Sequence, residues 1–300
     1  DGDFMIQIKN LRKRLGRRDV LQGLDLEISV GQRVALIGSN GAGKTTLIRC
    51  LLGEYTREGD VSLVGRDPRR FRTEVLRHVG FVPQLPPPLK MPVGQLIRYV
   101  ASLCEADSGH IAEVATRLGF DAERFRHQPF VRLSGGQKQK LLIATALGRD
   151  ADVLILDEPA ANLDPEARST FFELLAEHQK GAVMLISSHR LDEVAALVNR
   201  VIELDQGKVV LDDLVADSVD LTSRLVCEIR LTRPEKAFAK AIDAWGFTDA
   251  GNGLTWRGTV AGADRLRFLG MLSRYAALIA VLDLREADTE SLNARGCVNA

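Results

Sequence analysis

The sequence lacks the features that mark membrane-spanning, secreted and collagen-like proteins. Its longest apolar runs are only a few residues, against the roughly 20 of a membrane-spanning helix, and its N-terminal stretch has no signal-peptide core. Its cysteines lie far apart and in no metal-ligand spacing, at Cys50, Cys104, Cys227 and Cys297. Such spacing is typical of reduced thiols in a cytoplasm. The three classes are therefore excluded.

Neither sign of charge dominates, since 40 Lys and Arg residues balance 40 Asp and Glu residues. A net basic field of the kind that attracts nucleic acid is absent, so no nucleic-acid partner is expected. At 300 residues the chain is long enough for one large domain and one small domain. Roughly 75% of the unfolded surface is buried on folding at this size, so a core forms without a disulfide or a metal.

Strand and helix patterns alternate from the N-terminus to about residue 211. Ile6–Ile8 and Leu24–Ile28 alternate apolar and polar residues, as half-buried strands do. Three continuous apolar stretches predict strands covered on both faces, at Arg33–Ile37, Asp152–Leu156 and Val183–Ser187. Helical spacing follows over Lys44–Leu52 and dominates Leu96–Leu147. These patterns predict an α/β fold with a mostly parallel sheet.

The remaining residues, 221–300, show a different pattern, which predicts an accessory domain beside a main domain of residues 1–220. Apolar residues alternate over Leu225–Leu231, and Pro234 opens a helical pattern. A turn at Gly251–Gly253, a strand to Val260, a helix over Ala263–Tyr275 and a strand over Leu278–Leu284 complete it. With a short strand near Phe247, the order is βαββαβ, a small α+β domain of the ferredoxin-like kind.

A glycine-rich segment follows the first continuous apolar strand. Gly38, Ser39, Asn40, Gly41, Ala42, Gly43, Lys44 and Thr45 match G-x-x-x-x-G-K-[ST], and Thr46 continues into the predicted helix. The glycines let backbone N–H groups converge on phosphate oxygens, while Lys44 reaches the outer phosphates and Thr45 binds Mg²⁺. The alternative is a glycine turn with a surface lysine, which would not require a strand before the segment and a helix after it. Nucleotide binding is predicted.

Two acids end the second continuous strand, at the edge of an open α/β sheet where ligands collect. Asp157 is predicted to hold Mg²⁺ through water, as the acidic partner of the phosphate loop. Glu158 is placed to polarise the water that attacks the γ-phosphate. The alternative is that the pair merely ends a strand in solvent.

A third motif precedes a helical run to about Leu147. In Leu133-Ser134-Gly135-Gly136-Gln137, Ser134 and Gln137 have the spacing of a capping box. Gly135 and Gly136 are poor residues for a first helical turn, which favours a second anion site made of side-chain-free amides.

With these motifs the chain resembles the ATP-binding-cassette (ABC) ATPases, the nucleotide-binding subunits of transporters. The resemblance covers about Ile6 to Leu211. It includes Gln84 in Gly80–Gln84, the signature segment Leu133–Gln137, the Asp157-Glu158 pair, Ala161–Asp164 and Ser188-His189. It implies a P-loop NTPase (RecA-like) core with an antiparallel β subdomain and a helical subdomain at about residues 85–150.

The resemblance also implies roles for three further residues. Gln84 would contact Mg²⁺ or the attacking water and link the site to a membrane partner; otherwise it is a polar loop residue. His189 would hold the γ-phosphate and orient Glu158; a lone histidine is more often structural. Asp164 would shape the dimer contact, or it is a helix N-cap before Pro165.

In this family two subunits pack head to tail, and each ATP lies between one phosphate loop and the opposite signature segment. The implied cofactors are ATP and Mg²⁺, and the implied partners are a second copy and an integral-membrane permease. The chain would lie on the cytoplasmic face of the membrane. The appended domain and the tail Asp288–Asn293 resemble exporter-type ATPases, which serve small molecules, lipids, haem, ions or metal-cofactor components. The alternatives are a non-transport ABC ATPase in complex assembly or maturation and an interaction protein with an inactive ATP site.

The chain departs from the family at the position that usually offers an aromatic ring to adenine, which is Leu15 here. Leu15 can still make apolar contact with the base, but it cannot stack on it. This difference affects the affinity for the base and leaves the phosphate chemistry unchanged. Basic clusters at Arg12–Arg14, Arg17-Arg18 and Arg66–Arg72 are interpreted as solvated surface, with lipid headgroups or permease loops as the alternative. Lys140 is also predicted to lie at the surface.

Overall fold

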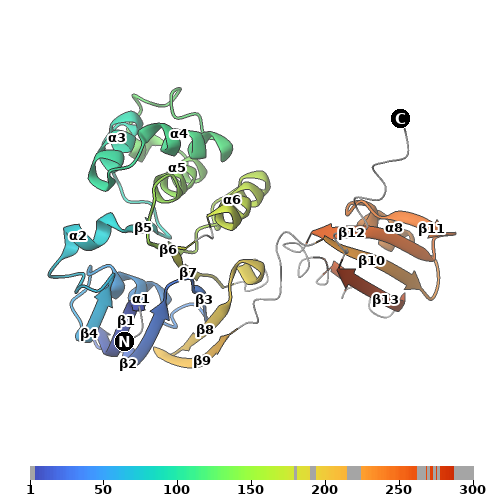
Figure 1. The fold of residues 1–300 in the computed structure, drawn as a ribbon, viewed down its shortest axis with the longest axis horizontal. Coiled ribbons are helices and arrows are strands. Elements are labelled where there is room, and N and C mark those ends of the chain that lie inside the picture. The colour runs from blue at the N-terminus through green and yellow to red at the C-terminus, as the bar shows by residue number, and fades with distance from the viewer. Residues whose placement is uncertain are drawn as a thin grey trace. The chain divides into compact units, whose positions relative to one another are not determined.

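The computed structural model describes residues 4–178, 181–189, 194–214, 224–261, 268, 271–272, 275 and 278–286. The chain divides into two compact units, Asp1–Val215 and Ala216–Ala300, and each is described by itself (Figure 1). No helix among the described residues is both long and apolar enough to cross a membrane.

A six-stranded sheet forms the centre of the first unit. Its order is β5 (Val79–Val82), β6 (Val153–Asp157), β7 (Val183–Ser187), β3 (Arg33–Ile37), β8 (Arg200–Asp205) and β9 (Lys208–Leu214). All neighbouring strands are parallel except β8 and β9, which form the antiparallel edge. Every residue of β6 and β7 is buried, as their continuous apolar sequences predict. The α/β prediction is confirmed.

A second, antiparallel sheet packs beside it. Its order is β2 (Arg18–Ser29), β1 (Phe4–Leu15) and β4 (Glu58–Leu63). Alternate residues of β1 and β2, including Ile6, Ile8 and Leu26, join one core with the apolar side of α1 (Lys44–Leu51). The antiparallel β subdomain is therefore present, and the turn between β1 and β2 lies next to the start of α1.

The helices include a group on the other side of the central sheet. In Figure 1, α3 (Val93–Cys104), α4 (Ser108–Arg117) and α5 (Gly135–Leu147) lie together, opposite β1, β2 and β4. The helix α2 (Arg72–Arg77) precedes β5, and α6 (Pro165–Glu177) joins β6 to β7. Helix α5 lies against β5 so closely that a Cβ on Gly80 would stand 2.9 Å from the Ala146 carbonyl oxygen.

The second unit has its own sheet and core. Its order is β11 (Thr248–Gly251), β12 (Thr255–Ala261), β10 (Arg224–Leu231) and β13 (Ile279–Glu286), all antiparallel. Helix α8 (Lys236–Asp243) contributes Phe238 and Ile242 to a core that includes Trp256 and Phe268. The strand expected near Phe247 is β11. Most of the helix predicted over residues 263–275, and all of the tail 288–293, lie outside the described residues.

Candidate functional site

The phosphate loop Gly38–Thr45 connects β3 to α1 in a backbone conformation that requires glycine. Gly38, Gly41 and Gly43 have φ values of 145°, 85° and 114°, and a Cβ on Gly38 would stand 2.3 Å from the Leu204 carbonyl oxygen. Lys44 is buried and folds back over the loop, where its Nζ donates to the Gly38 carbonyl oxygen at 2.6 Å. The ammonium group therefore lies against the start of the phosphate loop, within reach of the Gly38 and Ser39 carbonyl oxygens.

The structure brings distant predicted residues together around one cavity of about 470 Å³. The lining residues are Leu15, Arg18, Val20, Ser39, Asn40, Gly41, Gly43, Lys44, Thr45, Thr46, Gln84 and Glu158. They come from the β1–β2 hairpin, the phosphate loop, the segment after β5 and the end of β6. None of these side chains is aromatic, so Leu15 and Val20 supply the apolar surface on the hairpin side.

The acid pair at the end of β6 is held from the neighbouring strand β7. The side chain of Asp157, a residue only 2% exposed, accepts a hydrogen bond of 2.5 Å from the Ser187 hydroxyl. Glu158 has a φ of 46°, and its N–H donates to the Ser187 hydroxyl at 3.0 Å. Sequence reasoning missed Ser187; its one signal was that it ends the next buried strand, where its register partner is Asp157.

His189 is placed directly beside the second acid. Its Nδ1 lies 2.9 Å from Glu158 Oε2, and the His189 side chain is 58% exposed while that of Glu158 is 11% exposed. A further cavity of about 190 Å³ has both residues in its lining, together with Ser188. An exposed ring bonded to a mostly buried carboxylate can orient that carboxylate and still reach a ligand.

The signature segment begins α5 and stands apart from this cavity. Ser134 and Gln137 form a complete capping box, in which the Ser134 hydroxyl accepts from Gln137 N–H at 3.2 Å and the Gln137 side chain accepts from Ser134 N–H at 2.9 Å. Ser134 and Gly135 are exposed, Gly136 is half-buried, and none of them lines the cavity that contains Lys44. The N-terminus of α5 is thus open to a ligand from outside this copy.

Asp164 takes the cap position that was one of its two predicted roles. Its Oδ1 accepts from the Ala167 N–H at 2.9 Å at the start of α6. Its Oδ2 lies 2.8 Å from Lys140 Nζ, and the hydrogen bond from Lys140 holds the pKa of Asp164 below its usual value. The prediction that Lys140 lies at the surface is wrong, because its side chain is only 15% exposed and joins α5 to the segment before α6.

The donor chemistry at this site fits Mg²⁺ bound with a triphosphate. Thr45 and Gln84 offer neutral oxygens in the cavity, and Asp157 offers a buried carboxylate beside it. Mg²⁺ prefers oxygen ligands and takes only one or two carboxylates when phosphates supply the rest. Among the described residues, no cluster of three or more His, Cys, Asp or Glu side chains could hold a metal ion by itself.

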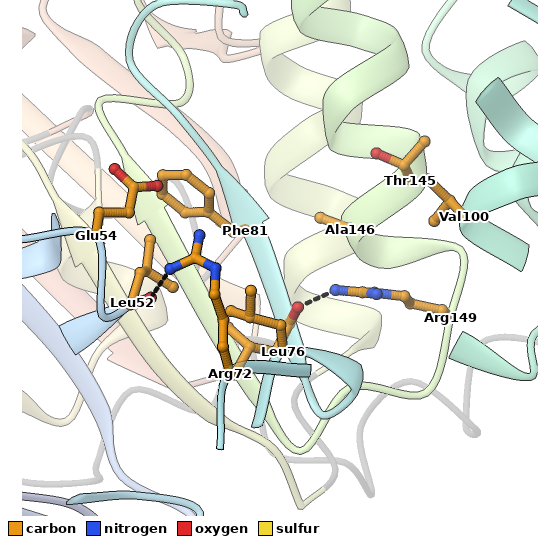
Figure 2. A pocket seen from close by; sticks show the side chains of 10 residues that line it. Leu52, Glu54, Arg72, Leu76, Phe81, Val100, Thr145, Ala146 and Arg149 are labelled. Carbon is orange, nitrogen blue, oxygen red and sulfur yellow. Dashed lines mark hydrogen bonds between the residues drawn. The ribbon is translucent and has the colours of Figure 1, made fainter. Parts of the chain in front are cut away.

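Another cavity, of about 250 Å³, lies between the central sheet and the helices (Figure 2). This groove is lined by Leu52, Glu54, Arg72, Leu76, Val79, Phe81, Val100, Thr145, Ala146 and Arg149. Arg72 donates to the Leu52 carbonyl oxygen at 2.9 Å, and Arg149 donates to the Val79 carbonyl oxygen. Its mainly apolar lining suits a protein segment better than a phosphate.

Comparisons with known proteins are consistent with this geometry. A family model described as ABC transporter matches residues 21–161. A Nod factor export ATP-binding protein I of Cupriavidus metallidurans is 35% identical over 232 residues, which cover 75% of each chain. An aliphatic sulfonates import ATP-binding protein SsuB 3 of Pseudomonas savastanoi is 35% identical over 214 residues, 70% of this chain and 76% of that one.

Solved structures share the fold of the first unit. A structure of an ATP binding subunit of an ABC transporter has a TM-score of 0.64 and 26% identity, over 72% of this chain and 91% of that chain. A dimeric structure of a post-hydrolysis state of the ATP-binding cassette MJ0796, bound to ADP and Pi, has a TM-score of 0.61 and 23% identity. The match covers 70% of this chain and 99% of that chain.

Proposed function

The chain belongs to the ABC transporter family as an ATP-binding, ATP-hydrolysing subunit, and on this premise we propose that two copies close around ATP and Mg²⁺ to drive a separate permease. One observation supports the closure most directly. The phosphate loop, Gln84 and Glu158 share a cavity, whereas Ser134 and Gly135 lie exposed outside it. A head-to-tail pair brings the signature segment of one copy to the cavity of the other.

Each group in the cavity has a distinct role in this proposal. The loop amides and Lys44 neutralise the triphosphate, with Ser39–Ala42 around the outer phosphates and Thr46 at the start of α1. Bound Mg²⁺ supplies charge neutralisation of the phosphates, and Thr45, Gln84 and Asp157 are the residues that would hold it, Asp157 through water.

Glu158 is the group that handles the proton of the attacking water. Its carboxylate accepts that proton as the water attacks the γ-phosphate. His189, bonded to Glu158 through Nδ1, orients the carboxylate, and a protonated ring can donate to a phosphate oxygen at the same time. Ser134, the amides of Gly135 and Gly136, and Gln137 of the second copy complete the anion site. Asp164 lies at the dimer contact in this arrangement.

The groove of Figure 2 is the proposed contact for the permease. Phe81 lines the groove and Gln84, three residues later in the same chain segment, lines the nucleotide cavity. The following residue, Leu85, is 75% exposed and begins the segment that runs to Gly94. A permease segment in the groove therefore acts on the strand that leads to Gln84, and closure of the dimer is transmitted through residues 85–94.

We propose export as the direction, supported by the relatives named Nod factor export ATP-binding protein I. Import is the second candidate, since a relative named for aliphatic sulfonates import is equally identical. The names of these relatives favour transport over the alternative of complex assembly. The permease places the chain at the cytoplasmic face of the membrane and selects the cargo.

The substitution Glu158→Gln tests the catalytic assignment. Because it removes the proton acceptor without changing the size of the side chain, it is expected to lower kcat for ATP hydrolysis by about 10²-fold or more. It should also accumulate an ATP-bound dimer on a sizing column in Mg-ATP. The matched control is Glu166→Gln, the same change at an exposed acid in the first turn of α6. Equal hydrolysis by wild type and Glu158→Gln would overturn the assignment, and a persistent monomer would overturn the shared site.

A further inference from the structure

One buried hydroxyl contacts both acids of the proposed catalytic pair. Ser187, the last residue of β7, is fully buried and is the register partner of Asp157 on β6. Its Oγ donates to Asp157 Oδ1 at 2.5 Å and accepts from the Glu158 N–H at 3.0 Å. A serine hydroxyl has one donor and two acceptor positions, so it can make both bonds at once.

The backbone at Glu158 depends on this contact. A φ of 46° is sparsely populated by residues other than glycine, and such a conformation persists where the surrounding structure holds it. Ser187 provides two acceptors for the Glu158 N–H, the hydroxyl and, at 3.3 Å, its own carbonyl oxygen. This turn directs the Glu158 side chain toward the nucleotide cavity while Asp157 stays buried at the strand end.

The orientation of the Asp157 carboxylate also depends on the Ser187 hydroxyl. Within the described residues, the Ser187 hydroxyl is the one side-chain or backbone donor that reaches this carboxylate. The bond occupies Oδ1, and no donor among the described residues reaches Oδ2. A buried carboxylate fixed in this way presents one defined oxygen, as the hydrogen-bonded carboxylates of metal sites do.

We propose that Ser187 is a positioning residue for ATP hydrolysis, one hydroxyl that orients Asp157 toward Mg²⁺ and holds the turn that aims Glu158 at the attacking water. The inference rests on the proposed roles of these two acids. The role proposed for Ser187 on β7 differs from that of the phosphate loop, which binds the nucleotide, since Ser187 does not line the cavity that contains Lys44.

The substitution Ser187→Ala tests it. Because partners of metal-site carboxylates are worth about 10–100-fold in affinity or activity, kcat should fall and the Mg²⁺ concentration for half-maximal rate should rise within that range. The KM for ATP should change by less than about threefold, since the phosphate loop is untouched. Binding of Mn²⁺ as the probe ion, followed by EPR with a non-hydrolysable ATP analogue, should weaken about 10-fold. Ser187→Thr, which keeps the hydroxyl, should restore the Mg²⁺ dependence.

Two further variants separate positioning from stability. Val183→Ala removes buried atoms from the same strand and should lower the melting temperature while leaving the Mg²⁺ dependence at its wild-type value. Ser187→Cys keeps a side chain of similar volume but replaces the hydroxyl with a weak donor, so it should behave like Ser187→Ala. If the threonine of Ser187→Thr does not fit, this variant still tests whether the hydroxyl itself is needed.

The inference is overturned if Ser187→Ala hydrolyses ATP with wild-type kcat and wild-type Mg²⁺ and Mn²⁺ dependence, or if Val183→Ala shifts that dependence equally. Glu158→Gln in the same assay distinguishes failure of the positioning role from failure of the proposed catalytic assignment. An inactive Glu158→Gln beside a normal Ser187→Ala refutes the positioning role alone, whereas an active Glu158→Gln refutes the proposed catalytic assignment.

Discussion

Glu158, the proposed proton acceptor, has some features that follow from its local sequence and others that do not. Its identity as an acid after a buried strand is visible in the sequence, and so is its neighbour Asp157. Its φ of 46° and its bond to Ser187, 29 residues later in the chain, are not visible there. They depend on the register of β6 against β7, which local patterns do not specify.

Lys140 is the residue where sequence reasoning failed. A lysine two positions after another lysine on a helix is usually a solvated surface residue. Here its stem is mostly covered, and its Nζ pairs with Asp164, which at the same time caps α6. The neighbouring Gln139 donates to the Pro159 carbonyl oxygen at 2.9 Å. The two contacts attach α5 to the segment that follows Glu158.

The cysteines allow a prediction about pH. Burial raises the pKa of the Cys50 thiol to about 11 and that of Cys227 to about 12, since the charged thiolate is disfavoured away from water. At pH 8 roughly one Cys50 side chain in a thousand is then the reactive thiolate. Iodoacetamide at pH 8 should leave both unmodified in the native protein and modify them after unfolding, as site mapping by mass spectrometry would report. The half-buried Cys104 is the internal reference, and rapid native labelling of Cys50 would contradict the expected protection.

At the scale of elements, strongly patterned segments matched their predictions, whereas β5 was missed. The strands β3 and β7 have their predicted bounds, β6 begins and ends one residue later than predicted, and α1 was expected within one residue of its observed end. The strand β5 was not predicted, because Val79–Val82 is only four residues, contains Gly80 and is followed directly by a proline. It nevertheless joins the groove to Gln84.

The start of α5 combines a structural cap with the proposed anion site, and two substitutions separate these functions. Ser134→Ala removes the acceptor for the Gln137 N–H and should cost about 1 kcal/mol of unfolding free energy. Ser134→Asp keeps a favourable cap, so its unfolding free energy should stay close to that of wild type. Its negative charge should nevertheless repel the triphosphate of the second copy, and hydrolysis should fall at least about tenfold. Chemical denaturation and an ATPase assay measure the two effects; full activity of Ser134→Asp would refute the anion role.

On the scale of the whole molecule, each unit has a hydrophobic core cluster of its own among the described residues. The first includes Ile6, Leu36 and Val183, and the second includes Phe238 and Trp256. Each core belongs to one compact unit, so each unit satisfies the basic requirement for folding independently.

A fragment of residues 1–215 is therefore expected to fold and to hydrolyse ATP. Every residue proposed to bind nucleotide or Mg²⁺ lies within it, and the described core cluster around its two sheets contains no residue of the second unit. Thermal unfolding should show one cooperative transition, and the ATPase rate at high protein concentration should approach that of the full chain. An insoluble fragment, or one without a transition, would show that the units depend on each other.

The proposed permease contact gives a second prediction at this scale. Val100→Asp places a charge in the groove and should abolish co-purification with the permease, because burying a carboxylate against a mainly apolar lining is costly. Leu103→Asp makes the same change at an exposed position of α3 outside the lining, and should retain the permease. Equal loss in both variants, or in neither, would refute the groove as the contact.

The sequence by itself determined the family, the α/β class, the phosphate loop, the acid pair and the capping box, because each is a short pattern whose chemistry depends on neighbouring residues. Tertiary structure alone decided which of them meet. Gln84 joins the cavity of residues 38–46, Ser187 supports both acids, Lys140 pairs with Asp164, and the signature segment stays outside its own copy's cavity. These relations depend on strand register and packing between distant segments, and such interactions are set by burial over the whole fold rather than by local spacing.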